Sequence, residues 1–333
     1  TAKAEDITID KTVNDVEADN VSIGDTVTFD IIADIPTFPA NALAKNYSIS
    51  DTLPTGLTLT EGSIRVYGVP AEGNEVLLTE GEGNDYTLTT GGDTTFTLTF
   101  DYDEISTYAD IHVTYTAMLN GNAVPGTANT NNAEVTYTNN PYVENSSTTK
   151  EDEATVYTYG LDISKVDADD KEQTLTGAEF ELYASSENAT SGTTPIAFVD
   201  EGNGTYRKAT ANDETTTTTL AVDENGQLIL KGLDAGTWYL KETKAPDSYN
   251  LLESPIEVQI VANTDGSTGL LDGTVQNAST DNNALRFLEV ANDDGFQLPV
   301  TGGMGTVIFT AVGVALMGAA IVLVIIAVKK RKA

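Results

Sequence analysis

The chain contains no cysteine and only one histidine among its 333 residues. Disulfide bonds, cysteine or paired-histidine zinc sites, and Ser-His-Asp or Cys-His catalytic centres are therefore excluded. The single histidine, His112, lies between two apolar residues of an alternating segment and is expected to face solvent. Any covalent cross-link inside the fold must use side chains other than cysteine.

Basic residues are scarce, with 17 Lys and Arg against 51 Asp and Glu and a net charge of −34. Four basic residues occupy positions 329–332, so residues 1–301 carry 13 basic groups (17 − 4) against 51 acidic ones, a net −38. Such a body repels nucleic acid and anionic lipid and stays soluble outside the cell. The acidic segments 167–170 and 292–294 lack EF-hand spacing and are interpreted as solvated turns, so no metal or cofactor is expected.

Long helical patterns are absent before the C-terminus, whereas Thr, Asn and Asp are abundant and short segments alternate between apolar and polar residues. This composition favours β-rich modules joined by polar turns. The length suits two domains of roughly 150 residues plus a tail. We therefore predict an all-β chain with a first domain over 1–157, a second over 158–297 and a tail over 298–333.

The tail contains the uncharged segment 304–328, followed by the basic segment 329–333. At ~1.5 Å per residue this segment can cross a ~30 Å hydrocarbon core as a helix, with the basic residues remaining in the cytoplasm. On its own this pattern predicts a single-span membrane anchor. The chain starts at Thr1 with neither an initiator Met nor a signal peptide, so it is expected to be a fragment or a processed product.

The pentapeptide Leu298-Pro299-Val300-Thr301-Gly302 directly precedes the apolar span. The pentapeptide, the span and the basic end together resemble the LPXTG sorting signal of Gram-positive surface proteins. The resemblance implies that a sortase attacks the Thr301 carbonyl and releases the peptide from Gly302 onward. The threonine is then transferred to an amine of a neighbouring pilin subunit or of peptidoglycan. The expected location is extracellular, in the cell wall or a pilus, with the helix only a transient anchor.

Three polar residues of the second domain, Lys165, Glu242 and Asn292, occupy positions where strand alternation predicts the core. A lone buried charge is costly or becomes neutral. For one such residue, the ordinary explanation is a strand end from which the side chain reaches water. An amine, an acid and a carboxamide together indicate a reactive site instead.

Four segments of this domain resemble a Cna B-type, prealbumin-like pilin domain, and they are 160–165, 177–182, 236–246 and 290–292. One departure is Ser248, where such domains usually have glycine. The resemblance implies an isopeptide bond between Lys165 and Asn292, with Glu242 as the catalyst. Burial would leave the lysine as a free amine, a protonated acid could assist the amide, and folding would bring them together. Such a site reacts once, so an enzyme with turnover is disfavoured.

The first domain repeats this arrangement, because Lys11, Asp51 and Asn131 also lie in apolar registers. Segments 9–13, 23–29, 51–57 and 131–140 resemble the fimbrial isopeptide domain of type D2. That resemblance implies an immunoglobulin-like sandwich with a Lys11–Asn131 bond and Asp51 as the acid. Asn132 is the competing partner, although its parity points it outward.

The order of a D2-type domain, a Cna B-type domain and an LPXTG signal resembles a backbone pilin. Such pilins usually carry a Tyr-Pro-Lys-type motif whose lysine accepts the next subunit. This motif is absent here, so the acceptor is expected upstream of Thr1, and Lys3 is interpreted as a solvated terminal residue. The predicted function is a structural subunit of a sortase-assembled pilus that supports adhesion. The alternative is a non-polymerising, wall-anchored adhesin or minor pilin that binds a host ligand.

Overall fold

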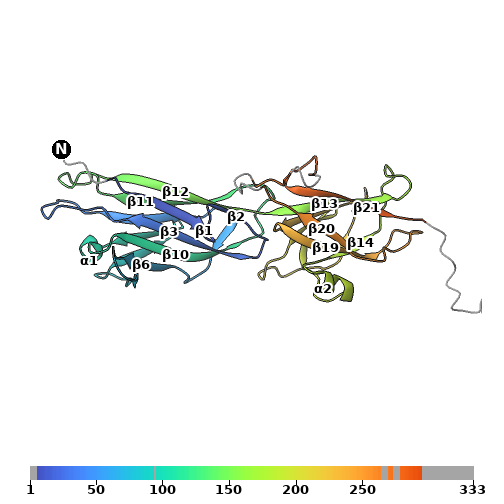
Figure 1. Ribbon diagram of the computed structural model, residues 1–333, viewed down its shortest axis with the longest axis horizontal. Coiled ribbons are helices and arrows are strands. Elements are labelled where there is room, and N and C mark those ends of the chain that lie inside the picture. The colour runs from blue at the N-terminus through green and yellow to red at the C-terminus, as the bar shows by residue number, and fades with distance from the viewer. Residues whose placement is uncertain (1–5, 94, 264–268, 273–277, 295–333) are drawn as a thin grey trace, which may run out of the picture.

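The structure is a computed structural model that describes residues 6–93, 95–263, 269–272 and 278–294. Two β-rich domains lie end to end along the long axis, with the N-terminus at one end and strand β21 leading out of the other (Figure 1). The prediction of an all-β fold is confirmed, and the only helices among the described residues are two short ones, α1 (Tyr102–Ile105) and α2 (Ser186–Ser191).

The first domain is a sandwich of two sheets around one apolar core. Its first sheet has the order β1-β3-β10-β6-β7, with β5 also paired to β10, and its second has the order β2-β12-β11-β4-β9-β8. The strands of the first sheet are β1 (Ile9–Val13), β3 (Thr26–Asp34), β5 (Leu57–Leu59), β6 (Arg65–Val69), β7 (Val76–Leu77) and β10 (Asp110–Leu119). Those of the second are β2 (Ala18–Asn20), β4 (Tyr47–Thr52), β8 (Tyr86–Thr90), β9 (Phe96–Phe100), β11 (Asn129–Tyr137) and β12 (Thr148–Tyr157).

Strict alternation of buried and partly exposed residues builds the centre of this sandwich. Every second residue of β10 and β11 is buried, which is the period expected of a strand with one face on the core. In β11 the buried face includes Asn129 and Asn131 together with Ala133, Val135 and Tyr137. The same alternation that buries apolar side chains thus carries polar ones into the interior.

The second domain also consists of two sheets, with the orders β15-β16-β18-β13-β21 and β17-β14-β19-β20. The strands of the five-stranded sheet are β13 (Tyr159–Asp167), β15 (Phe198–Gly202), β16 (Thr205–Lys208), β18 (Gln227–Leu233) and β21 (Leu285–Asn292). Those of the four-stranded sheet are β14 (Glu179–Tyr183), β17 (Leu220–Ala221), β19 (Gly236–Lys244) and β20 (Ile256–Ile260).

The first and last strands of the second domain, β13 and β21, are parallel neighbours. Their register sets Lys165 beside Val290 and Asp167 beside Asn292. Because side chains two residues apart share a face of a sheet, Lys165 and Asn292 lie on the same face, one diagonal step apart. Only Ser164 in β13 is not buried, so alternation alone does not separate the two faces of this strand.

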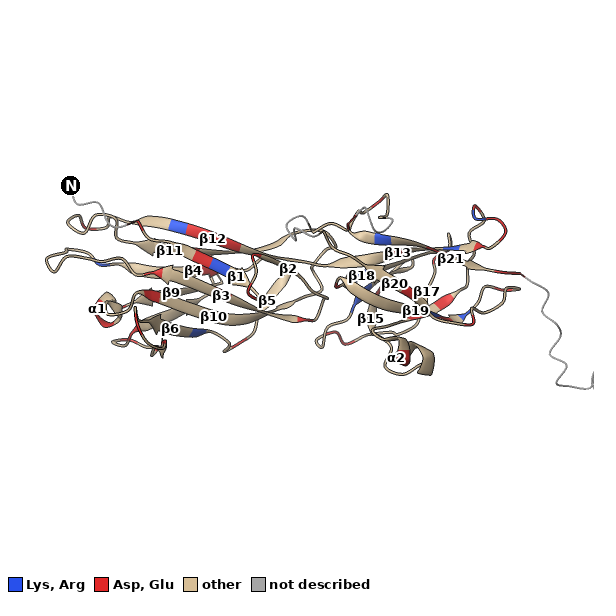
Figure 2. Ribbon diagram, viewed as in Figure 1, with Lys and Arg blue, Asp and Glu red and all other residues tan. Residues whose placement is uncertain are grey.

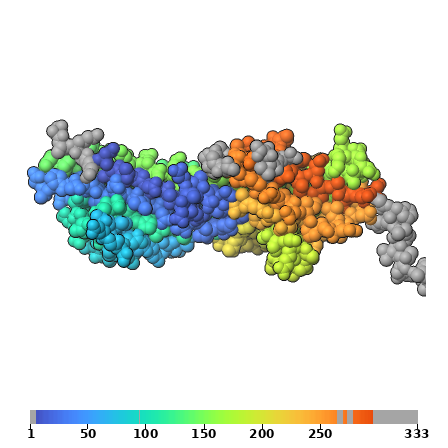
Figure 3. Space-filling view, viewed as in Figure 1, coloured from blue at the N-terminus to red at the C-terminus, as the bar shows by residue number. Residues whose placement is uncertain are grey.

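The chain passes from one domain to the other through Thr158 alone, since β12 ends at Tyr157 and β13 begins at Tyr159. The space-filling view shows the two domains in contact (Figure 3). Three hydrogen bonds join the segment after β2 to the second domain. Lys208 Nζ donates to the Ile23 carbonyl at 2.6 Å, the Asp234 amide donates to Ser22 Oγ at 2.9 Å, and the Ile23 amide donates to the Gly232 carbonyl at 3.0 Å. The joint is therefore a packed interface.

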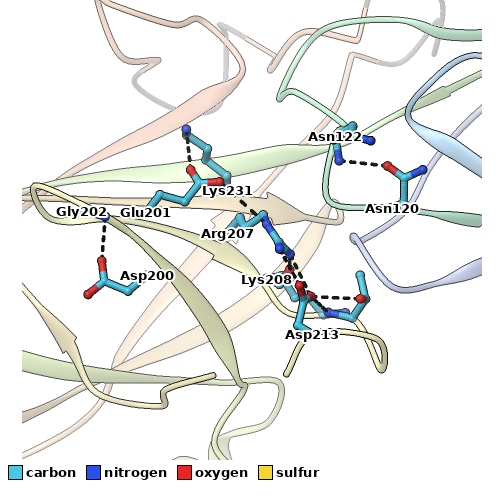
Figure 4. A network of polar contacts seen from close by, with 10 residues as sticks. Asn120, Asn122, Asp200, Glu201, Gly202, Arg207, Lys208, Asp213 and Lys231 are labelled. Carbon is cyan, nitrogen blue, oxygen red and sulfur yellow. Dashed lines mark hydrogen bonds and ion pairs between the residues drawn. The ribbon is translucent and has the colours of Figure 1, made fainter. Parts of the chain in front are cut away.

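Arg207 of β16 also contributes to the interface between the two domains. The Arg207 guanidinium donates to both carboxylate oxygens of Asp213, at 2.9 and 2.6 Å, beside the Asn120–Asn122 turn of the first domain (Figure 4). A Cβ atom at Gly121 would lie only 2.8 Å from Arg207 Cζ, so the turn can approach the guanidinium because it has glycine there. The bidentate ion pair fixes the plane against which this turn packs.

Candidate functional site

The polar residues predicted in the first domain meet inside the sandwich. Lys11 comes from β1, whereas Asp51 (β4) and Asn131 (β11) come from the opposite sheet, and all three are at most 1% exposed. Lys11 Nζ donates to Asp51 Oδ2 and, at 3.1 Å, to the hydroxyl of Tyr115 on β10. That hydroxyl donates to Asp51 Oδ2 at 2.9 Å and accepts a hydrogen bond from Asn131 Nδ2 at 2.5 Å.

Aromatic rings enclose the Lys11 amine. Its Nζ lies 5.2 Å from the centroid of Phe29 and 5.5 Å from that of Tyr115, and Phe96 packs edge-on against the Tyr115 ring. Burial lowers the pKa of Lys11, and the charge of Asp51 opposes this only in part. Burial likewise raises the pKa of Asp51 despite the neighbouring lysine. Both shifts favour the pair of neutral groups, an amine beside a carboxylic acid.

The carboxamide of Asn131 is held by its nitrogen. Its Oδ1 has no hydrogen-bond partner within the described part of the protein, and neither does Asp51 Oδ1. Asn132, the competing partner predicted from sequence, lies on the opposite, partly exposed face of β11. Asn129 is a second buried carboxamide on the inner face, but its Nδ2 donates to the Val156 carbonyl at 3.1 Å. The amide that shares the network of the lysine and the acid is therefore that of Asn131.

Tyr115 belongs to this cluster but was not identified from the sequence. In the pattern of β10 it occupies the same register as Ile111 and Val113, so it is expected to be an ordinary core residue. A buried tyrosine needs a partner for its hydroxyl, and this requirement is the signal that could have drawn attention to it. Its partners come from three other strands, which the sequence does not place beside it.

In the second domain, Lys165, Glu242 and Asn292 are also buried, with exposures of 0%, 3% and 1%. Asn292 Nδ2 donates to Glu242 Oε2, which reaches across from β19 of the opposite sheet, at 2.9 Å. Lys165 Nζ donates to the carbonyl of Val290, its neighbour in register on β21, at 2.9 Å. Burial lowers the pKa of Lys165 to about 8, although the charge of Glu242 acts in the opposite direction. A larger fraction of this lysine than of an ordinary one is therefore a neutral amine near neutral pH.

The loop after β19 covers this second cluster. The Asn250 carbonyl accepts a second hydrogen bond from Asn292 Nδ2 at 2.6 Å, and the Leu252 amide donates to Glu242 Oε2 at 2.9 Å. The remaining oxygens, Glu242 Oε1 and Asn292 Oδ1, have no partner within the described residues. Ser248 has φ = 76°, which explains why glycine is usual at this position.

The acidic turn that begins at Asp167 has local partners. Asp167 accepts hydrogen bonds from the amides of Asp169 (2.7 Å) and Asp170 (3.0 Å) through Oδ1, and from the Tyr249 hydroxyl (2.7 Å) through Oδ2. This pattern is a side-chain-stabilised turn tied to the loop that covers the site. Over the residues that the structure describes, no group of three His, Cys, Asp or Glu side chains is placed to hold a metal.

His112 lies on the outer face of β10 between two carboxylates. Its Nε2 contacts Asp30 Oδ1 and its Nδ1 contacts Glu75 Oε2, both at 2.9 Å. Burial disfavours the charged ring, but the hydrogen bonds to Glu75 and Asp30 outweigh this effect, so the pKa of His112 is raised above 6.5. Two acceptors are satisfied together only when both ring nitrogens carry protons.

This geometry predicts a pH-dependent attachment of β7, which directly follows Glu75. Because the pKa of His112 is higher in the folded protein than in the unfolded chain, the two ion pairs stabilise the fold fully below the unfolded value of about 6.5. This stabilisation is lost as the pH rises through the raised, folded value. Amide hydrogen exchange at Val76 and Leu77 should therefore accelerate across that range, after correction for intrinsic rates. His112→Gln should abolish the added step, whereas an unchanged profile would contradict the ion-pair explanation.

The sorting pentapeptide 298–302, the apolar span 304–328 and the basic end 329–333 lie outside the described residues. Within the described part of the chain, no helix has the length and apolar character needed to span a bilayer. The described part ends at Asp294, just after β21, at the far end of the second domain from the first (Figure 1). Figure 2 shows acidic residues in both domains, in keeping with the strongly negative net charge.

Three family profiles match the chain. A profile described as Gram-positive pilin backbone subunit 2, Cna-B-like domain, matches residues 23–141. A prealbumin-like fold domain matches residues 160–275, and an LPXTG cell wall anchor motif matches residues 292–333. The first profile thus carries a Cna-B-like description for the domain whose motifs resemble the D2 type.

Individual proteins give the same result. The trypsin-resistant surface T6 protein of Streptococcus pyogenes is 28% identical over 97% of this chain and 67% of its own length. The crystal structure of the group B streptococcus pilus 2b backbone protein matches with a TM-score of 0.62 and 28% identity, over 87% of this chain and 99% of that one. BcpA, the major pilin subunit of Bacillus cereus, matches in fold with a TM-score of 0.55 and 23% identity, over 88% and 71% of the two chains.

The two sandwiches with their buried polar clusters, together with these matches, define a structural protein of the bacterial surface, not an enzyme that turns over a substrate. Over most of its length the chain matches profiles and proteins of the LPXTG-anchored pilus backbone class of Gram-positive bacteria. The predictions of a structural subunit of a sortase-assembled pilus and of an extracellular location in the cell wall or pilus are confirmed. Its partners are accordingly other pilin subunits, sortase and the cell wall.

Proposed function

We propose that each domain of this pilus subunit forms an intramolecular isopeptide bond as it folds, Lys11–Asn131 in the first and Lys165–Asn292 in the second. The observation that supports this most directly is the burial of an amine, a carboxyl group and a carboxamide in each domain. In the first domain the three groups share one hydrogen-bond network. In the second, Asn292 binds Glu242, and Lys165 Nζ binds the carbonyl of Val290, two residues before Asn292. Burying these groups separately is costly, and amide formation replaces the ionisable lysine amine with a neutral amide.

The chemistry follows from the neutral forms of the pair. An uncharged lysine amine attacks Cγ of the asparagine, and the new Cγ–Nζ bond replaces the Cγ–Nδ2 bond as ammonia leaves. The carboxylic acid, Asp51 or Glu242, donates a hydrogen bond to the developing oxyanion, for which the unpartnered Oδ1 atoms of Asn131 and Asn292 are available. Folding provides the proximity that a bimolecular reaction lacks.

The two bonds would connect the sandwich in different ways. Lys11 and Asn131 belong to opposite sheets, so their bond would join the sheets across the core. Lys165 and Asn292 belong to adjacent parallel strands, so their bond would join the first strand of the second domain to its last. We place the boundaries of the cross-linked units at 1–157 and 158–297, on either side of the crossing at Thr158.

Peptide mapping by mass spectrometry tests this proposal. Each bond removes one ammonia from the folded chain and resists trypsin at the lysine, so two branched peptides should appear. One should contain Lys11 and Asn131, and the other Lys165 and Asn292. Unmodified lysines and asparagines in the wild-type chain would refute the proposed chemistry, and the loss of a single ammonia would restrict it to one domain.

We further propose that sortase cleaves after Thr301 and that this threonine is joined to an amine of the next subunit or of peptidoglycan. Thr301→Ala should abolish the ladder of covalent multimers on denaturing gels and leave the protein in the membrane fraction. Thr306→Ala, a threonine in the apolar segment that follows, is the matched control and should retain the ladder. Undiminished polymer from the Thr301 variant would contradict this assignment of the linking residue.

A further inference from the structure

The hydroxyl group of Tyr115 stands between the two nitrogen atoms that exchange places in the proposed first-domain reaction. It accepts hydrogen bonds from Lys11 Nζ at 3.1 Å and from Asn131 Nδ2 at 2.5 Å, and it donates to Asp51 Oδ2 at 2.9 Å. The Tyr115 residue is 1% exposed, so bulk water does not compete for these contacts. A single oxygen thus touches the attacking nitrogen, the leaving nitrogen and the acid.

The environment keeps this phenol in place and protonated. Its ring stacks on Phe29 with centroids 5.4 Å apart and meets Phe96 edge-on at 5.2 Å. Burial and the nearby charge of Asp51 raise the pKa of Tyr115 well above 10. A neutral phenol can accept one proton and release its own in a single step. A backbone carbonyl in the same place could only accept a proton and would have none to give to the leaving nitrogen.

We infer that Tyr115 is a catalytic residue of the first domain, passing a proton from the attacking Lys11 nitrogen to the departing Asn131 nitrogen. This inference rests on the proposed Lys11–Asn131 bond. Attack of neutral Nζ on Cγ gives an intermediate with an excess proton on Nζ, while Nδ2 becomes a basic amine. Tyr115 takes the proton from Nζ and turns its own O–H to Nδ2. The Cγ–Nδ2 bond then breaks, ammonia leaves, and Tyr115 and Asp51 end in their starting protonation states.

The second domain shows a different arrangement around the corresponding atoms. There, Nδ2 of Asn292 donates directly to the catalytic acid, Glu242, at 2.9 Å and to the Asn250 carbonyl at 2.6 Å. The carboxyl group can therefore deliver a proton to the leaving nitrogen itself. In the first domain, the partner of Nδ2 is the Tyr115 hydroxyl, so removal of that hydroxyl should affect one bond and spare the other.

The test uses Tyr115→Phe in the full chain, synthesised in a cell-free system with detergent and sampled over time. Branched peptides report each bond separately. The Lys11–Asn131 bond should form about 10²-fold more slowly, the lower end of what a general acid–base group contributes. The Lys165–Asn292 bond should form at the wild-type rate. Tyr47→Phe is the matched control, because Tyr47 is equally buried in this domain but its hydroxyl binds the Ala33 carbonyl at 3.2 Å.

The possible results distinguish the role of Tyr115 from the existence of the Lys11–Asn131 bond. Absence of the Lys11–Asn131 peptide from the wild-type chain means that the proposed bond itself is wrong. If the wild-type chain forms the Lys11–Asn131 bond and Tyr115→Phe forms it within twofold of the wild-type rate, only the role of Tyr115 is overturned. Asn131→Ala cannot form the bond. Adding Tyr115→Phe to this variant and comparing the two unfolding temperatures therefore measures the purely structural effect of losing the hydroxyl.

A measurement on the wild-type chain covers the case in which the phenylalanine variant fails to fold. In the relay two protons move in one step, from Nζ to the Tyr115 oxygen and from that oxygen to Nδ2, whereas direct delivery from a carboxyl group moves one proton in the step that releases ammonia. Deuterium oxide should therefore slow the first-domain bond more than the second-domain bond within the same molecules. Equal slowing of the two bonds would overturn the relay, whatever the behaviour of the variant.

Discussion

Replacing Glu242 with alanine is expected to prevent the loss of one ammonia and to lower the unfolding temperature of the second domain by on the order of 20 °C. The Lys165–Asn292 bond would close a loop on the order of 100 residues, and a cross-link of that span stabilises by about 5 kcal/mol through the unfolded state. Without the acid, the buried Lys165 amine also loses the charge that does most to raise its pKa. Calorimetry and intact mass on the same sample measure both effects.

Two further variants identify the cause of that loss. Lys165→Met removes the nucleophile but keeps a side chain of similar length in the core, so its destabilisation reports the missing cross-link with little added burial cost. Glu289→Ala alters an exposed glutamate on β21 and should change neither the number of ammonia molecules lost nor the unfolding temperature. Full ammonia loss in Glu242→Ala would show that this acid is dispensable for the bond.

Alternation along single strands was enough to predict which polar side chains of the first domain enter the core. Lys11, Asp51 and Asn131 each sit on the buried face of a strand whose other buried residues are mainly apolar, so the period of two identifies them without any knowledge of topology. The same reasoning turned Asn132 outward. Local geometry is sufficient here because a strand has only two faces.

Contacts between residues from different strands, loops or domains could not be predicted from alternation along a single strand. Tyr115 has the register of a core residue, and only the pairing of β10 with β3 and the approach of the opposite sheet place its hydroxyl among the reacting groups. The Asn250 carbonyl is a backbone atom of a loop, so residue type carries no signal. The contact of Arg207 with Gly121 joins two domains and depends on the packing of their ends.

The positions of the two proposed bonds also predict how the subunit responds to tension along the pilus. In the second domain the load would pass from β13 through Lys165–Asn292 into the end of β21, so residues 166–291 would carry none of it. In the first domain Asn131 lies near the start of β11, not on the last strand. Residues 132–157, which form most of β11 and all of β12, therefore remain in the load path.

Single-molecule pulling between residue 6 and residue 294 should consequently show an asymmetric response. The wild-type subunit should gain at most on the order of 90 Å, the length of the roughly 26 residues beyond Asn131 at ~3.5 Å each. Lys11→Met should add on the order of 400 Å from the first domain, and Lys165→Met a similar length from the second. Asp103→Ala, which removes an exposed ion pair with Lys45, should leave the wild-type trace unchanged. A wild-type chain that extends as far as both methionine variants combined would show that neither bond carries load, because only a covalent link that bypasses the loops can hold them folded.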